Sequence, residues 1–139
     1  QIGGETLSLE VISKIINNNL QLELSEVVIQ QVNSCRTYLD EKLKRENHPI
    51  YGINTGFGPM ASHVIGRSQF LELQENLIRS HTAGVGDPID PSFSLAAMVV
   101  RLNTFARGNS GVSLELIEQL KNFINKSFIV RTGIFFYFK

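Results

Sequence analysis

The segment from Phe93 to Phe105 is apolar on nearly every side of the helix that it would form. Asp90 and Pro91 precede it, and these residue types favour the N-cap and the first position of a helix. Gly108 follows it and ends the pattern. A surface helix keeps a polar face, whereas a helix without one is buried among other elements. The segment therefore predicts a helical body in which other helices surround it.

Four further segments carry apolar residues at spacings of three and four, the pattern of an amphipathic helix. Each begins near a residue that can cap a helix or ends at asparagine, glycine or the residue before a proline. They run from Leu9 to Ile16, from Ser25 to about Glu46, from Ser68 to Gly84 and from Ser113 to Ile124. In the last of them, the side chains expected to face inward are Leu116, Ile117, Leu120, Phe123 and Ile124. Residues 21–24 alternate like a brief strand, so we predict a mainly α chain with two or three very short strands.

Composition and charge exclude several classes of partner. Thirteen basic residues balance thirteen acidic ones, so the tight nucleic-acid binding that neutralises many phosphates is not expected. No run approaches the roughly 20 apolar residues of a membrane helix, and the first residues do not resemble a signal peptide. The single cysteine, Cys35, suits a reducing cytoplasm, and His48, His63 and His81 lack the spacing of metal ligands. We therefore expect a cytoplasmic protein without a metal, a membrane partner or a nucleic-acid partner.

The segment YGINTGFG at 51–58 contains three glycines in seven positions and must be a loop, because glycine weakens a helix interior. The glycine order differs from the G-x-G-x-x-G of dinucleotide-binding loops. Gly58 is followed by Pro59, whereas a phosphate-binding loop ends in Gly-Lys, so phosphate binding is a weak alternative. Two interpretations remain: a plain turn, or a loop whose backbone amides approach a ligand, with Tyr51 at its edge.

Two side chains have both a structural and a functional interpretation. A free phenol ordinarily loses its proton near pH 10 or so, and a tyrosine that acts as a general base needs a positive group or a helix N-terminus beside it. The structural alternative for Tyr51 is a packed ring with a hydrogen-bonded hydroxyl. His81 follows Ser80 near a predicted helix end, where it either complements the helix dipole or hydrogen-bonds a polar ligand ring.

Four segments resemble, in order and spacing, the aromatic amino acid lyase family, which contains the histidine, tyrosine and phenylalanine ammonia-lyases. YGINTGFG is similar to the signature loop of that family. The other three are LQENLIRSHTAGVGDPI at 73–89, RLNTFARGNSGV at 101–112 and LELIEQLKNFIN at 114–125. The resemblance covers roughly residues 5–127 and points most to histidine or bacterial tyrosine ammonia-lyases. It implies the N-terminal helical domain of the lyase fold over residues 1–127.

The resemblance implies roles for three residues. Tyr51 would be the base that removes the β-proton of the substrate, and Gly58 would lie against the substrate through its backbone. His81 falls where family members differ by substrate, and a Ser-His pair occurs both in histidine lyases and in some bacterial tyrosine lyases. The substrate ring therefore stays open among imidazole, phenol and phenyl. A complete relative would convert L-histidine to urocanate or L-tyrosine to coumarate, typically as a homo-oligomer whose subunits share active sites.

The family captures its substrate with methylidene-imidazolone, an electrophile that forms from an Ala-Ser-Gly triplet. No such triplet occurs in this sequence, and the resemblance stops at residue 127. We therefore expect a truncated lyase that is inactive by itself. Residues 128–139, with five aromatic side chains, would be an apolar tail foreign to the family, produced by a frame-shift or truncation. The alternative is a non-catalytic helical oligomerisation or interaction module.

Overall fold

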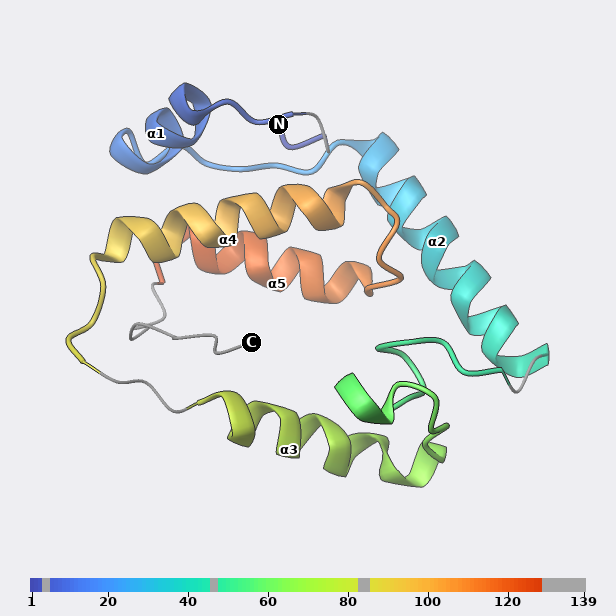
Figure 1. Ribbon diagram of the computed structural model, residues 1–139. Coiled ribbons are helices and arrows are strands. Elements are labelled where there is room, and N and C mark those ends of the chain that lie inside the picture. Colours follow the sequence, from blue (N-terminus) through green and yellow to red (C-terminus); the bar gives the residue numbers. More distant parts are fainter. Residues whose placement is uncertain (4–5, 46–47, 83–85, 129–139) are drawn as a thin grey trace.

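The computed structural model describes residues 1–3, 6–45, 48–82 and 86–128. Within them the chain forms five α-helices: α1 (Leu9–Asn17), α2 (Glu26–Arg45), α3 (Phe70–His81), α4 (Pro91–Ala106) and α5 (Leu114–Asn125). In Figure 1, α4 and α5 lie side by side, α1 runs along α4, and α2 crosses beside them. α3 lies apart and packs against no other α-helix of the described part of the chain. The predicted mainly α class is confirmed.

One face of α4 forms the centre of the core, against α1, α2 and α5. Val99, Leu102 and Ala106 on this face have no exposed surface at all. The opposite face stays uncovered, since Phe93 is 67% and Val100 is 46% exposed. Among the described residues, other helices thus pack on one side of this segment only, and apolar side chains are exposed on the other.

Side-chain caps set the starts of the helices where the sequence predicts them. Asp90 Oδ1 accepts hydrogen bonds from the hydroxyl and the backbone N–H of Ser92, at 2.6 and 2.8 Å. These two bonds, that of the hydroxyl first, lower the pKa of the Asp90 carboxyl. The hydroxyl oxygens of Ser25 and Ser113 accept the N–H of the third residue after each of them, both at 3.3 Å. The predicted N-caps of α2, α4 and α5 are therefore confirmed.

The end of α1 also follows the prediction, whereas details of α3 and α5 differ from it. Asn19 takes the left-handed backbone, with φ of +47°, just after α1. α3 ends at His81, and its predicted stop at Gly84 falls outside the described residues. Leu116 is 49% exposed instead of facing inward. The buried stripe of α5 runs through Ile117. Because consecutive helical positions are turned by about 100°, Leu116 points away from this stripe.

α5 ends in a Schellman motif built around Ser127, whose φ is +51°. The N–H of Phe128 donates to the Phe123 carbonyl at 2.8 Å, and that of Ser127 donates to the Ile124 carbonyl at 2.9 Å. The rings of Phe123 and Phe128 stack with their centroids 5.3 Å apart, which supplies the apolar contact of the motif. Phe128, the first residue of the predicted tail, thus completes the end of α5. The rest of that tail, 129–139, lies outside the described residues.

The side chain of Asn125 joins the end of α5 to the segment that precedes α2. Its Oδ1 accepts the N–H of Leu22 at 2.8 Å, and its Nδ2 donates to the carbonyl of Leu22 at 2.9 Å. The amide therefore pairs with the backbone as a neighbouring strand would. This is why the predicted strand at 21–24 is reduced to a single parallel bridge between Leu24 and Ile2. The only other bridge in the described part of the chain joins Thr55 and Val64.

Replacing Asn125 by alanine should lower the free energy of unfolding by about 1–3 kcal/mol, because the N–H and the carbonyl of the buried Leu22 both lose their partner. Urea denaturation followed by circular dichroism measures this. Asn122→Ala is the matched control, since Asn122 is an exposed asparagine of the same helix and the change in helix propensity is shared. Equal effects of the two substitutions would contradict the importance of the Asn125–Leu22 pairing.

Candidate functional site

Residues 50–53 form a β-turn with Tyr51 at its second position. The N–H of Ile53 donates to the carbonyl of Ile50 at 3.0 Å, which closes the turn. Gly52 has a φ of +76°, whereas Tyr51 keeps a negative φ. This combination identifies a type II turn, whose third position requires φ near +80° and therefore glycine. The turn leaves Tyr51 at the surface, with 64% of its area exposed.

Two buried polar residues, Asn54 and Thr55, fold the loop around this turn. Asn54 Oδ1 accepts the N–H of Ile50 at 2.6 Å, and its Nδ2 donates to the carbonyl of His48 at 2.9 Å. Thr55 Oγ1 accepts the N–H of Gly52 at 3.3 Å and donates to the carbonyl of Gly56 at 2.9 Å. The loop is therefore a hydrogen-bonded unit and more than a simple chain reversal.

Asn54 and Thr55 were not among the site residues predicted from the sequence. Their residue types were the available signal, because Asn and Thr side chains often bond nearby backbone groups in turns. Burial of both, at 6% and 1% exposed, distinguishes them from ordinary loop residues and is visible only in the folded chain.

The two later glycines of the loop have different reasons to be glycine. A Cβ on Gly56 would lie 2.6 Å from the Cβ of Met60, so a side chain does not fit there. Gly58 has a φ of +56°, and a Cβ there would have no atom within 4 Å. Gly58 is thus exposed with open space beside its backbone, at the start of a 3₁₀ turn over Gly58–Met60.

The ring of Tyr51 meets that of Phe57 edge to face, with the centroids 6.2 Å apart. Within the described residues, no group forms a hydrogen bond with the Tyr51 hydroxyl. The structural alternative, a tyrosine with a satisfied hydroxyl, is therefore not what this part of the chain shows. Tyr51 is exposed, and its phenol oxygen has no hydrogen-bond partner among the residues that the structure describes.

His81 is the exposed last residue of α3, and one of its ring nitrogens is already engaged. Nδ1 lies 2.8 Å from the carbonyl oxygen of Leu77 and 2.9 Å from Oγ of Ser80. A carbonyl can only accept, so the contact with Leu77 places the proton on Nδ1. In the neutral ring, Nε2 is then a hydrogen-bond acceptor. It suits a ligand ring that carries an O–H or N–H group.

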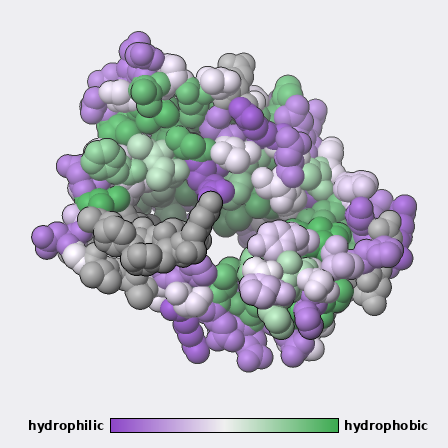
Figure 2. All heavy atoms as spheres, viewed as in Figure 1, coloured by the Kyte–Doolittle hydropathy of each residue, from purple (hydrophilic) through white to green (hydrophobic). Residues whose placement is uncertain are grey.

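The structure does not bring Tyr51 and His81 together. In Figure 1 the loop that carries Tyr51 lies toward the N-terminal end of α3, whereas His81 ends the helix. At about 1.5 Å per residue, a helix of this length separates its two ends by about 18 Å. The space-filling view in Figure 2 shows an opening between this part of the molecule and the α4–α5 pair.

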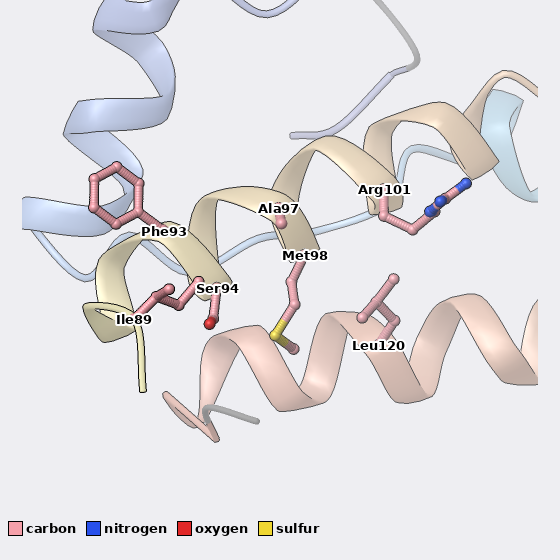
Figure 3. A pocket seen from close by; sticks show the side chains of 7 residues that line it. All are labelled: Ile89, Phe93, Ser94, Ala97, Met98, Arg101 and Leu120. Carbon is pink, nitrogen blue, oxygen red and sulfur yellow. The ribbon is translucent and has the colours of Figure 1, made fainter. Parts of the chain in front are cut away.

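A separate apolar cavity of about 270 Å³ lies between α4 and α5 and contains none of the predicted site residues. Figure 3 shows Met98 of α4 and Leu120 of α5 both pointing into the space between the two helices, with Arg101 farther along α4. Across the described ranges, no three metal-binding side chains come together. No helix in these ranges is long and apolar enough to cross a membrane.

Comparison with known sequences shows which proteins this chain is similar to. Residues 7–130 match the family model of the aromatic amino acid lyases. The chain is 38% identical over 128 residues to histidine ammonia-lyase of Staphylococcus aureus strain MRSA252. This match covers 92% of the chain, which spans only about a quarter (25%) of the length of that curated relative.

Solved structures agree in fold. Tyrosine aminomutase from Streptomyces globisporus superimposes with a TM-score of 0.79 at 34% identity, over 90% of this chain and 24% of the other. Histidine ammonia-lyase from Trypanosoma cruzi superimposes with a TM-score of 0.75 at 31% identity, over 89% of this chain and 23% of the other. Because the family model spans nearly the whole chain and the fold agrees, this chain belongs to the aromatic amino acid lyase family.

Proposed function

We propose that this chain provides the proton-accepting and ring-binding residues of an ammonia-lyase that acts on L-histidine or L-tyrosine. The observation that carries the proposal is Tyr51, which lies exposed on a hydrogen-bonded turn and whose hydroxyl has no partner in the described part of the chain. Family membership and the histidine ammonia-lyase relatives support the reaction class. The product would be urocanate from histidine or coumarate from tyrosine.

In this proposal Tyr51 acts as a base at the β-carbon of the substrate. The β C–H bond breaks and its proton passes to the Tyr51 oxygen, which has to act in its deprotonated, phenolate form. The C–H bonding pair forms the Cα–Cβ double bond while the C–N bond breaks, and the amine leaves with the C–N bonding pair. Such a step requires the phenol oxygen within hydrogen-bond reach of the β-proton, which an exposed side chain on a fixed turn can provide.

Gly58 and His81 are proposed to bind the substrate. The open backbone of Gly58 lets a ligand approach closely. The free Nε2 of His81 would accept a hydrogen bond from an imidazole N–H or a phenol O–H. The separation of the Tyr51 loop from His81 by the length of α3 favours a homo-oligomer in which one substrate contacts residues from different subunits. The lone free Cys35 agrees with the proposed cytoplasmic location.

The electrophile is not provided by these residues. Methylidene-imidazolone forms from Ala-Ser-Gly, and none of the 139 residues belongs to such a triplet. The described side chains therefore do not fit the group, and we assign no step through it to this chain. By itself the chain is proposed to be inactive. The boundary between a lyase-like domain at 1–127 and a foreign tail at 128–139 also remains a proposal.

One observation favours the alternative of a non-catalytic interaction module. The uncovered face of α4, with Phe93 and Val100, and the isolated α3 leave apolar surface that a partner chain could bury. A hybrid enzyme separates the two functions. In it, residues 1–128 replace the matching segment of the Staphylococcus aureus histidine ammonia-lyase. A folded but inactive hybrid would favour the module.

In this hybrid, Tyr51→Phe should lower kcat about 10²- to 10⁴-fold, the usual contribution of a general base. Formation of the conjugated acid from histidine or tyrosine, followed by ultraviolet absorbance, gives the rate. The chain of 139 residues alone should give no product above the buffer blank. Unchanged kcat in Tyr51→Phe would remove the role of the phenol, and product from the chain alone would refute its proposed inactivity.

His81→Leu in the same hybrid should raise the ratio of kcat/KM for phenylalanine to that for histidine or tyrosine by about tenfold or more. A site that hydrogen-bonds a ring group rejects the analogue that lacks it, and leucine removes this acceptor. Ser80→Ala is the neighbouring control, because it keeps Nε2 of His81 available. If the substrate ratio does not move in His81→Leu, the imidazole does not contact the ring.

A further inference from the structure

Tyr51 is held by its backbone and little by packing of its own side chain. It is exposed, and its only ring contact in the described part of the chain is the edge of Phe57. The direction of such a side chain depends on the φ and ψ angles at its Cα, which are rotations of the two adjoining planar peptide groups. Fixing both peptide groups therefore fixes the direction of the Cα–Cβ bond of Tyr51, from which the ring extends.

Both peptide groups are fixed by hydrogen bonds from within the loop. In the peptide group before Tyr51, the carbonyl oxygen of Ile50 accepts hydrogen bonds from the N–H groups of Ile53 and Asn54, at 3.0 and 3.2 Å. The peptide after Tyr51 has its N–H on Gly52, which donates to Thr55 Oγ1 at 3.3 Å. Asn54 in addition binds the Ile50 N–H through its side chain, at 2.6 Å.

We propose that Asn54 and Thr55 are positioning residues that fix the orientation of Tyr51 for proton removal, an inference that rests on the proposed base function of Tyr51. Their side chains are polar and buried in a loop whose turn is exposed, and their bonds lie on either side of the tyrosine. The loop thereby fixes the direction in which the Tyr51 side chain leaves the backbone.

The hydroxyl of Thr55 is the more important of the two groups for this inference. Its Oγ1 accepts from Gly52 and donates to the Gly56 carbonyl, so it joins the turn to the bridge between Thr55 and Val64. Valine has nearly the same shape without the hydroxyl, and serine keeps the hydroxyl without the methyl group. The two substitutions therefore separate hydrogen bonding from packing at a residue that is 1% exposed.

A base displaced by about 1 Å can lose about 10²-fold in rate while the substrate still binds. In the hybrid enzyme, Thr55→Val should lower kcat about 10- to 100-fold with KM nearly unchanged, and Thr55→Ser should recover most of the lost rate. Thr55→Val combined with Tyr51→Phe should be no slower than Tyr51→Phe alone, because the threonine acts through the tyrosine.

Hydrogen exchange on the chain of 139 residues gives a second readout without catalysis. Thr55→Val should accelerate exchange of the Gly52 amide and leave the core amides of α4 and α5 protected. If Thr55→Val fails to fold, Asn54→Asp replaces it in both experiments. This variant keeps an acceptor for the Ile50 N–H and removes the donor to His48, so the His48–Ile50 segment should exchange faster and kcat should fall.

The inference is overturned if Thr55→Val keeps the parental kcat, or if its loss of rate persists in the Tyr51→Phe background. It is also overturned if serine is as poor as valine, since packing would then be the cause. If the proposed function itself is wrong, Tyr51→Phe keeps the full kcat, irrespective of the effect of the Thr55 substitutions.

Discussion

Burial of one face of α4 is the interaction on which the rest of this fold depends. Val99, Leu102 and Ala106 are completely enclosed, and α1, α2 and α5 are the helices that enclose them. Because burial of a large aliphatic side chain contributes about 1.5–3 kcal/mol, this face supplies much of the stability of the domain. The pairing of Asn125 with Leu22 then closes the core, since it binds segments 103 residues apart in the sequence.

The glycine-rich loop is organised independently of that core. All the described hydrogen bonds that shape it join residues between 48 and 65, so its geometry comes from its own sequence. α3, which carries His81, packs against none of the core helices in the described part of the chain. Stability and the proposed chemistry are thus assigned to different segments. Substitutions in the loop can change rates while the helical core stays folded.

Features set by local interactions could be predicted from the sequence, whereas those set by distant contacts could not. The caps at Ser25, Asp90 and Ser113 follow from residue types next to the helices they start. The short strand at 21–24 failed as a prediction because a side chain from α5 takes the backbone partners of Leu22. The family motifs led to Tyr51 and His81, but no pattern separated Asn54 and Thr55 from ordinary loop residues, since only folding buries them.

The most direct test of the central claim is a crystal structure of the hybrid enzyme with a bound substrate analogue that cannot lose its amine. We expect the loop to keep its turn and the Tyr51 oxygen to lie about 3–3.5 Å from the β-carbon of the ligand. The ring of the ligand should form a hydrogen bond with a His81 side chain. A ligand bound with its β-carbon far from every copy of Tyr51 would contradict the assignment of this residue as the base.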